Sequence, residues 1–389
     1  MANPNLALHL IPDLPDTAAL QPWLRRIDAQ RWYTNYGPLV TEFEEAMASL
    51  LSQAHGSRPL HLTSLVTGYH ALELGLRTLN LPSGGAVLMP AVTFPACPLA
   101  AHHAGLQPLL ADIDPDNWLL TPTIALAAAQ RHTIAAVMPV ALYGVPVDTE
   151  AWDAFYRATG IPVLIDAAAA VETQPIPRHG LVAHSLHATK PFGIGEGGLL
   201  VSADAALIAH ARQLSNFGTV ERICQDWGGA NAKLSEYHAA VGLAQLARWP
   251  EIKRRRAALR AVYQAALSDL PVRWQDGLEH ATNSLLMLDV TPLPAATLIA
   301  ALQARGIKAH QTYLPPLYHH PAFAALPRLS AAGVLVAWCE QAEHLSRYCC
   351  GVPFHPFMNP ADVAEVVSAL RAAGLQPASR SQAAASGAK

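Results

Sequence analysis

The sequence predicts an α/β protein: a large three-layer α/β/α domain with a mostly parallel sheet, followed by a smaller C-terminal α+β domain. Short apolar runs rich in Val, Ile and Leu recur along the first two-thirds of the chain, and helix-length stretches separate them. Strands without polar alternation, separated by helices, are typical of parallel sheets that helices cover on both faces. The chain has 389 residues, more than one small core requires, so a second domain is expected.

The expected strands are the apolar runs, in chain order PLHLTS near Leu60, AVLMP over 86–90, QPLLADI near Leu109, IAAVMPVAL over 134–142, IPVLID over 161–166 and GGLLVS over 197–202. The helices expected between them cover 69–79, 95–104, 121–130 and 149–159. A long helical stretch begins after Leu234, with charged residues on one side and Ala and Leu on the other. The remainder mixes short strands with helices, as in a smaller α+β domain.

The expected domain boundaries follow from these changes in character. We expect a large domain over 1–255, with the N-terminal segment included, and a small domain over 256–377. The last residues, 378–389, read PASRSQAAASGAK from Pro377 onward and contain almost nothing to bury, so we expect a disordered tail.

Composition and charge exclude several functional classes. A formal net charge of -3 gives no electrostatic case for nucleic acid or an acidic membrane surface. The N-terminus lacks a basic region followed by a long apolar core, and no apolar run reaches the roughly 18 residues that a membrane span needs. We therefore expect a cytoplasmic protein. The cysteines are scattered without a C-x-x-C pair and no H-E-x-x-H occurs, so neither a disulfide framework nor a metal site is expected.

The stretch HATKPFGIGEGGLLVS, from His187 to Ser202, combines two signals. Its glycines satisfy the spacing G-x-G-x-x-G, but they lead into strand-like LLVS, whereas a dinucleotide site needs a helix there. The second signal is Lys190, in a chain with few lysines. A lysine in an apolar or cationic pocket can have its pKa lowered enough to act as a nucleophilic amine. A surface lysine on a loop is the alternative, and the residue alone does not decide between them.

Further residues at the same expected sheet edge favour pyridoxal phosphate. Asp166 ends a strand, where it could cap a following helix or hold the proton on the cofactor's pyridine nitrogen. The turn at Thr67 and Gly68 precedes a helix whose N-terminus could bind the phosphate. Phe94 lies at the next strand-to-helix turn, either as core or stacked on the ring.

These pieces in this order resemble the DegT/DnrJ/StrS family of sugar aminotransferases, which are fold-type-I pyridoxal-phosphate enzymes. The resemblance covers nearly the whole chain, and its most specific parts are the lysine segment and the stretch NAKLSEYHAAVGLAQL. The resemblance implies that Lys190 forms the Schiff base with the cofactor and moves the proton. It also implies cofactor contacts from the remaining candidate residues, namely Asp166 on the pyridine nitrogen, Phe94 on the ring, and Thr67, Gly68, Tyr69 and Ser185 at the phosphate.

The same resemblance implies a homodimer, because Asn231 matches an asparagine that reaches into the neighbouring subunit's site. The implied reaction moves an amino group, commonly from glutamate, to a keto group on a nucleotide-linked sugar, in amino-sugar, polysaccharide or secondary-metabolite biosynthesis. Three positions depart from the family pattern. Ala169 replaces a His or Gln that touches the ring hydroxyl, and Val66 and Tyr69 alter the phosphate turn.

Two alternatives remain beside the aminotransferase. Sugar dehydratases of the same family carry a histidine in place of the lysine, so Lys190 argues against that chemistry. A non-catalytic regulatory homologue would bind the cofactor without converting it, and the altered positions are consistent with it.

Overall fold

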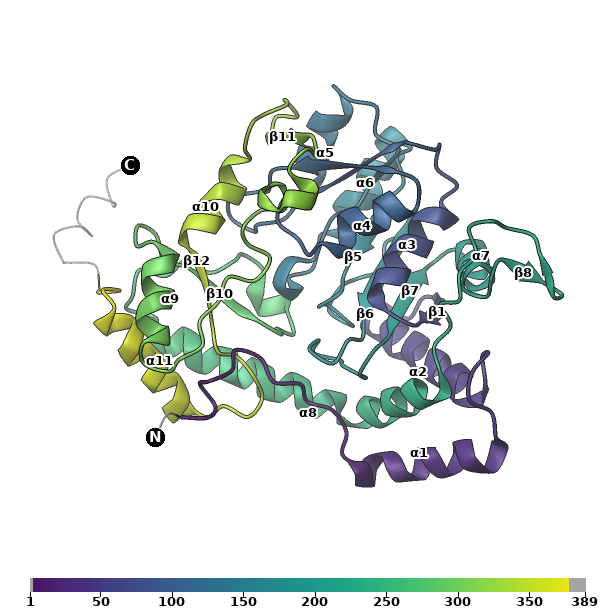
Figure 1. Ribbon diagram of the computed structural model, residues 1–389, viewed down its shortest axis with the longest axis horizontal. Helices are drawn as coiled ribbons and strands as arrows, with labels where there is room; N and C mark the ends of the chain where they lie inside the picture. Colours follow the sequence, from purple (N-terminus) through teal and green to yellow (C-terminus); the bar gives the residue numbers. More distant parts are fainter. Residues whose placement is uncertain (1–2, 378–389) are drawn as a thin grey trace.

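A central sheet of mixed direction organises the first two-thirds of the molecule (Figure 1), in a computed structural model that describes residues 3–377. Its strand order is β1, β7, β6, β5, β4, β2, β3, β11, where single bridges from Val137 to Val163 and from Val140 to Asp166 join the two halves. Neighbouring strands are parallel except around β7, which is antiparallel to β1 and β6. The strand bounds are β1 His61–Leu65, β2 Ala86–Pro90, β3 Gln107–Ala111, β4 Ala136–Val137, β5 Leu164–Asp166, β6 Leu181–Ser185, β7 Gly198–Ser202 and β11 Arg328–Leu329.

Helices cover both faces of this sheet, which confirms the predicted three-layer α/β/α class. Gly75 of α3 packs against Leu200 of β7 on one face. On the other face, Ser64 of β1 donates a hydrogen bond to Glu44 of α2, 2.8 Å away. The helix bounds in this part are α1 Thr17–Gln30, α2 Pro38–Ala54, α3 Gly68–Thr78, α4 Ala96–His103, α5 Pro122–Ala129, α6 Thr149–Thr159 and α7 Ala205–Ser215. None of the helices in the described residues is long and apolar enough to cross a membrane.

The long helix α8 (Glu236–Ala266) runs from the large part of the molecule to the smaller C-terminal part (Figure 1). It begins at a cap in which the Ser235 side chain accepts a hydrogen bond from the backbone N–H of His238. In the C-terminal part, β10 (Leu286–Asp289) pairs with β12 (Cys349–Val352) in antiparallel fashion. The helices around this pair are α9 Ala295–Gln303, α10 Glu340–Tyr348 and α11 Pro360–Ala372.

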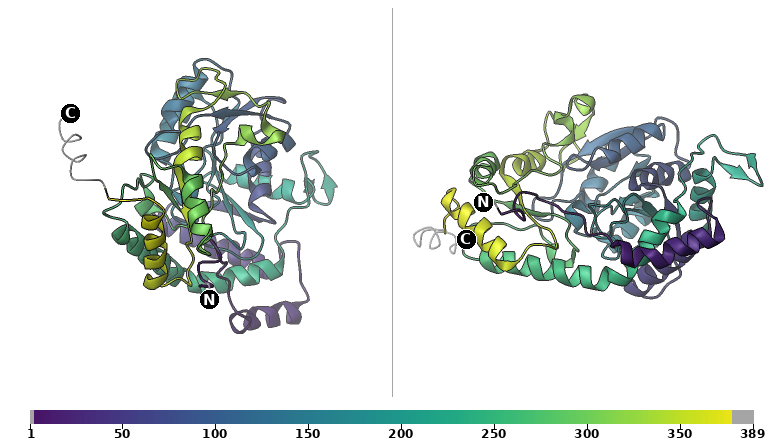
Figure 2. Two further views of the ribbon diagram at one scale, coloured as in Figure 1. Left: turned by 60° about the vertical axis from the view of Figure 1, so that its left-hand side comes forward. Right: turned by 60° about the horizontal axis from the view of Figure 1, so that its bottom comes forward.

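The start of the chain lies beside the C-terminal part (Figure 2). The carbonyl of Leu6 accepts a hydrogen bond from the N–H of Lys308, and the carbonyl of His9 accepts one from Phe354. Asn5 donates to Asp362 of α11. The boundaries near 255 and 377 stay predictions, but these first residues contact the part of the chain that was predicted as the small domain. The predicted disordered tail, 378–389, lies outside the described residues.

Most of the expected elements occur within a few residues of their predicted positions. The elements that were not predicted include β6, α1, α2, α7, α10 and β12. β6 has the sequence LVAHS, in which His184 and Ser185 interrupt the apolar run. Both residues have specific partners: His184 Nδ1 lies 3.0 Å from the Ala167 carbonyl, and Ser185 accepts from the His187 N–H. Because His184 and Ser185 are polar, the apolar pattern did not predict this strand, and both residues have hydrogen-bond partners at its carboxyl end.

Candidate active site

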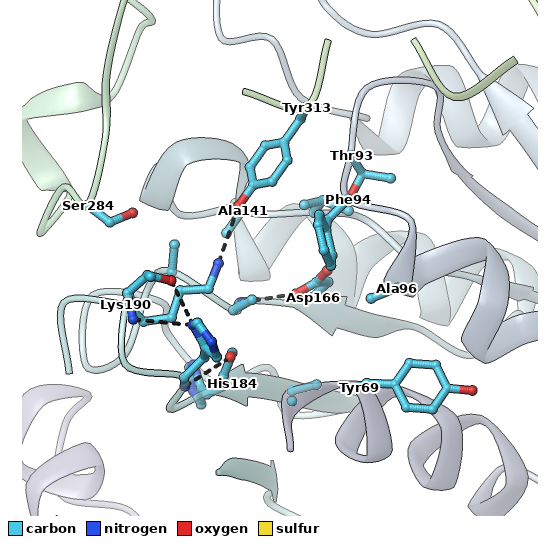
Figure 3. Close-up of a pocket in the computed structure, with 18 of the residues that line it drawn as sticks. Tyr69, Thr93, Phe94, Ala96, Ala141, Asp166, His184, Lys190, Ser284 and Tyr313 are labelled. Atoms are coloured by element: carbon cyan, nitrogen blue, oxygen red, sulfur yellow. Dashed lines mark hydrogen bonds between the residues drawn. The ribbon is translucent and has the colours of Figure 1, made fainter. Parts of the chain in front are cut away.

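A cavity of about 630 Å³ lies at the carboxyl ends of the parallel strands, where open α/β sheets bind ligands. Loops after β1, β2, β5 and β6 form most of its wall, and Ser284, Thr312 and Tyr313 from the C-terminal part complete it (Figure 3). His9 and Leu10, close to the start of the chain, also line it. The cavity is lined by the predicted residues Thr67, Gly68, Tyr69, Phe94, Asp166, Ala169, Ser185 and Lys190. Asn231 is not among the described residues that line it.

Lys190 projects into the cavity from the loop between β6 and β7. Its backbone N–H donates to the His187 carbonyl at 2.8 Å, and its Nζ lies 3.3 Å from the Tyr313 hydroxyl (Figure 3). The glycines shape this loop: a Cβ on Gly193 would lie 2.7 Å from the Ala188 carbonyl oxygen, and Gly195 has a φ of 101°. β7 then begins directly at Gly198. The glycines therefore return the chain to the sheet and do not open a dinucleotide-binding helix.

Taken together, the surroundings of Lys190 do not lower its pKa. Burial lowers this pKa. The nearby Tyr313 hydroxyl, followed by the Asp166 and Cys97 side chains, raises it by a larger amount, so the net shift of the pKa is upward. A lowered pKa requires an apolar or cationic pocket, whereas the groups nearest the amine are anionic or can become so. Lys190 is accordingly held as an ammonium ion until the charge of its surroundings changes.

Asp166 lies at the end of β5, with only 4% of its surface exposed. Its Oδ1 accepts a hydrogen bond from the Ala168 N–H at 3.0 Å, and its Oδ2 accepts one from the Cys97 thiol at 3.1 Å. Burial raises the pKa of Asp166, while the Cys97 and Ala168 donors and the charge of Lys190 oppose that rise. The chain after Asp166 forms turns up to β6, so the alternative role of capping a following helix is wrong.

Gly68 and Ser185 both line the cavity and lie in close contact with each other. A Cβ on Gly68 would lie 2.7 Å from the Ser185 Cβ, and a Cβ on Gly198 would lie 2.3 Å from the Thr67 carbonyl oxygen. The turn before α3 is therefore pressed against β6 and β7, where only glycine fits. Thr67 caps α3 by accepting a hydrogen bond from the His70 N–H. The first N–H groups of α3 and the Ser185 hydroxyl form a donor set that suits a phosphate.

The remaining predicted residues differ in orientation. The Tyr69 side chain points away from Lys190 (Figure 3) and its hydroxyl pairs with His103. Burial, followed by the nearby Glu73, raises the pKa of Tyr69 to about 12. Because its hydroxyl is engaged by His103, the backbone N–H is the part of Tyr69 that is placed for a phosphate. Phe94 is 57% exposed and faces the Tyr313 ring edge to face at 6.0 Å. The alternative of Phe94 as core is therefore wrong, and its ring is free to cover a flat ligand.

The residues of the cavity fit pyridoxal phosphate. A buried carboxylate, an amine and a donor-rich helix start surround one space, and a Cβ on Gly68 would close the phosphate end. The chain also matches the family model described as the DegT/DnrJ/EryC1/StrS aminotransferase family over residues 16–371. The chain belongs to this family. It is a pyridoxal-phosphate-dependent aminotransferase of fold type I, as its family and the architecture around the cavity indicate.

Individual relatives are similar to most of this chain. The Mycobacterium tuberculosis protein Rv3402c is 31% identical over 380 residues, covering 93% of this chain and 89% of that protein. The dTDP-3-amino-3,4,6-trideoxy-alpha-D-glucose transaminase of Streptomyces venezuelae is 28% identical over 354 residues, covering 89% of each.

Solved structures are similar along the whole chain. The structure of DesI in the presence of its TDP-sugar product has a TM-score of 0.84 at 30% identity and covers 99% of this chain and 96% of that one. A putative PLP-dependent aminotransferase from Bacillus cereus has a TM-score of 0.85 at 26% identity, covering 93% of this chain and 99% of that one.

Sequence reasoning missed two tyrosines of this aminotransferase's cavity. The rings of Tyr143 and Tyr313 stack at 5.6 Å, and the Tyr143 hydroxyl donates to the Thr312 carbonyl at 2.8 Å. Both have positive φ, 56° for Tyr143 and 63° for Tyr313. Bulky residues rarely adopt that region, and such strain is concentrated at functional sites. Tyr313 begins the stretch YLPPLYHHPAF over 313–323, but nothing in this stretch indicates that the ring lies against Lys190.

Asn231 belongs to a segment that pairs with the end of β1, where the Val66 N–H donates to the Ala232 carbonyl at 2.8 Å. Asn231 is exposed, and its side-chain oxygen accepts a hydrogen bond from Lys233 Nζ at 2.7 Å. Nearby, the hairpin of β8 (Thr219–Val220) and β9 (Ile223–Cys224) projects from the body of the molecule (Figure 1). The predicted role of Asn231 in a neighbouring subunit stays a prediction.

Proposed function

We propose that this aminotransferase moves an amino group from an amino acid, with glutamate as the expected donor, to the keto group of a nucleotide-linked sugar. The product would enter amino-sugar, polysaccharide or secondary-metabolite biosynthesis. The names of two relatives support a sugar acceptor, since one is a dTDP-sugar transaminase and the DesI structure contains a TDP-sugar product. The cavity wall adds His9, Ser284 and Thr312, whose neutral side chains suit sugar hydroxyls.

The position of Lys190 carries the proposal. Its amine is held 3.3 Å from the Tyr313 hydroxyl, in the same cavity as the buried Asp166 and the Gly68–Ser185 contact. Bound pyridoxal phosphate supplies an aldehyde that amines attack and a ring that withdraws electrons from the reacting carbon. Lys190 would bind the aldehyde covalently and carry the proton to and from the reacting carbon.

The other residues hold the cofactor in this proposal. Asp166 would keep a proton on the pyridine nitrogen, and Phe94 would cover the ring. The N–H groups at Thr67, Gly68 and Tyr69 and the Ser185 hydroxyl would hold the phosphate. The negative charge of Asp166 raises the Lys190 pKa, so pairing Asp166 with a protonated nitrogen would weaken that influence and release the neutral amine.

We also propose a homodimer with shared sites. Large apolar side chains are exposed on and around the projecting hairpin, namely Phe217, Val220, Ile223 and Trp227, and again at Trp32, Tyr33 and Tyr237. Such a gathering is typical of surfaces that a partner covers. Asn231 lies next to this hairpin and would reach the partner's cofactor. The cytoplasm is the proposed location, because the five cysteines are free thiols, as in reducing compartments.

The first experiment tests Lys190 directly. Purified protein with added pyridoxal phosphate should show a visible absorption band, and borohydride should fix the cofactor on the peptide containing Lys190, as mass spectrometry reports. Lys190→Ala should abolish the fixation, while Lys308→Ala, an exposed lysine, should not. Fixation that persists in Lys190→Ala would overturn the assignment.

The second experiment tests the reaction. Glutamate should remove the visible band by converting the cofactor to its amine form, and a keto sugar linked to a nucleotide should restore it. A protein that binds the cofactor but keeps the band with every amino donor would be the non-catalytic homologue. The relative EryC1, 28% identical over 355 residues, is named a sensory transduction protein. A retained band would therefore favour a regulatory role for this chain.

Complementation tests the shared sites. If Asn231 acts in the partner's site, mixing Lys190→Ala with Asn231→Ala subunits creates heterodimers in which one site has both native residues. Activity should then rise well above that of either variant alone. Without sharing, each heterodimer carries one defect in each site, and mixing restores nothing.

A further inference from the structure

Three buried side chains form a chain of hydrogen bonds in the cavity wall, where Thr93 and Asp166 line the cavity. The Thr93 hydroxyl lies 3.2 Å from the Cys97 sulfur, and the Cys97 sulfur lies 3.1 Å from Oδ2 of Asp166. Cys97 is fully buried, and Thr93 and Asp166 are 2% and 4% exposed. Thr93 and Cys97 belong to one short segment, because Thr93 follows β2 and Cys97 lies in the first turn of α4. Through Cys97 this segment contacts Asp166 at the end of β5.

The direction of the hydrogen bonds follows from the number of protons. Burial raises the pKa of Cys97 well above its ordinary value, as does the neighbouring Asp166, so the sulfur keeps its proton. A thiol has one hydrogen, and the carboxylate can only accept. Cys97 therefore donates to Asp166, and Thr93 must donate to the sulfur. Each bond in such a directed chain strengthens the next.

Asp166 needs this support because its surroundings work against its charge. Burial raises the pKa of Asp166 and favours the neutral acid. The groups that oppose burial are the Cys97 thiol, the Ala168 N–H and the charge of Lys190. A neutral Asp166 has no charge with which to keep a proton on a pyridine nitrogen. The hydrogen-bond donors to Asp166 are therefore needed to keep it ionised.

We propose that Cys97, oriented by Thr93, is a positioning residue that keeps Asp166 as an oriented carboxylate facing the cofactor's ring nitrogen. This inference rests on the proposed role of Asp166. The Lys190 amine would change its position and proton content as it enters and leaves the covalent link, whereas Cys97 and Ala168 remain as donors throughout. Cys97 thereby acts through Asp166 and needs no contact with the substrate.

The test measures Asp166 and the ring nitrogen separately. In the full-length chain without added cofactor, carbon-13 NMR of the aspartate carboxyls follows the Asp166 titration, with Asp166→Asn identifying the signal. Cys97→Ala should raise the pKa of Asp166 by about half a unit to one unit, because a thiol is a weak donor to a charged acceptor. In the holoenzyme, the nitrogen-15 shift of labelled pyridoxal phosphate should move toward its unprotonated value.

Two further variants keep the inference testable. Cys350→Ala removes an equally buried thiol in β12 and should leave both signals unchanged. Cys97→Ser replaces the thiol with a stronger donor and should lower the Asp166 pKa, which supplies a test if Cys97→Ala does not fold. Signals that are the same in wild type, Cys97→Ala and Cys97→Ser would overturn the inference. Failure of the proposed function is distinct, because it would appear in the wild-type protein as a cofactor band that no amino donor removes, whereas the present test compares signals between variants.

Discussion

The Tyr313 hydroxyl lies 3.3 Å from Nζ of Lys190, although 123 positions separate the two residues along the chain. This contact joins the loop after β6 to the C-terminal part of the molecule. Tyr313 also stacks on Tyr143 with an angle of 8° between the rings. The Lys190 amine is therefore held by one of two stacked tyrosines. Both tyrosines have positive φ, a backbone conformation that bulky residues seldom adopt.

Tyr313→Phe should lower the pKa of Lys190, because Tyr313 is the foremost of the neighbours that raise it. The acidic limb of the rate profile, where Lys190 loses its proton, should move to lower pH. The turnover number should fall about tenfold if the lost contact is worth a typical hydrogen bond to a charged group. Steady-state kinetics between pH 6 and 10 would check this, with Tyr156→Phe, whose ring stacks on His179, as control. An unchanged profile would contradict a role for the hydroxyl.

Gly68→Ala should weaken cofactor binding by about tenfold or more, since the added Cβ would lie 2.7 Å from the Ser185 Cβ and overpacking of this kind costs about 1–3 kcal/mol. Fluorescence titration with pyridoxal phosphate measures the affinity. No difference between Gly68→Ala and wild type would show that the phosphate does not bind at this turn.

Phe94→Leu should reduce cofactor affinity about fivefold, because an aromatic contact is worth about 1 kcal/mol beyond the area it buries. The ring is 57% exposed, so the melting temperature of the cofactor-free protein should stay the same. Phe357→Leu, at another exposed aromatic ring, is the control and should change neither quantity. Equal affinity in Phe94→Leu and Phe357→Leu would argue against ring stacking.

His184 should make the protein less stable in acid. Burial lowers its folded-state pKa from 6.5 to about 4, so between these values the unfolded chain binds a proton that the folded chain excludes. The free energy of unfolding should fall as pH drops through this window, by about 3 kcal/mol from this residue. His184→Asn can keep the donor to the Ala167 carbonyl but cannot titrate. Urea unfolding at pH 7 and pH 4.5 should show a smaller pH effect in that variant, and an equal effect would contradict the assignment.

The sequence by itself determined the features that depend on neighbours along the chain. Apolar runs alternating with helices predicted the layers, and a strand ending in Asp166 predicted a carboxylate at the sheet edge. The glycines after Lys190 predicted a turn that returns to the sheet. These signals are local, because hydrophobic period and turn chemistry are properties of a few consecutive residues.

Only the tertiary structure decided which groups touch. The partners of Lys190 and Asp166, namely Tyr313 and Cys97, come from other elements, and no local pattern marks them. The direction of the Lys190 pKa shift is not determined by the sequence for the same reason, since it depends on the charges that folding brings near the amine. The strand β6 was hidden because His184 and Ser185 are polar, and their hydrogen bonds exist only once the sheet has formed. Contacts between distant segments set both the electrostatics of the site and the shape of its walls.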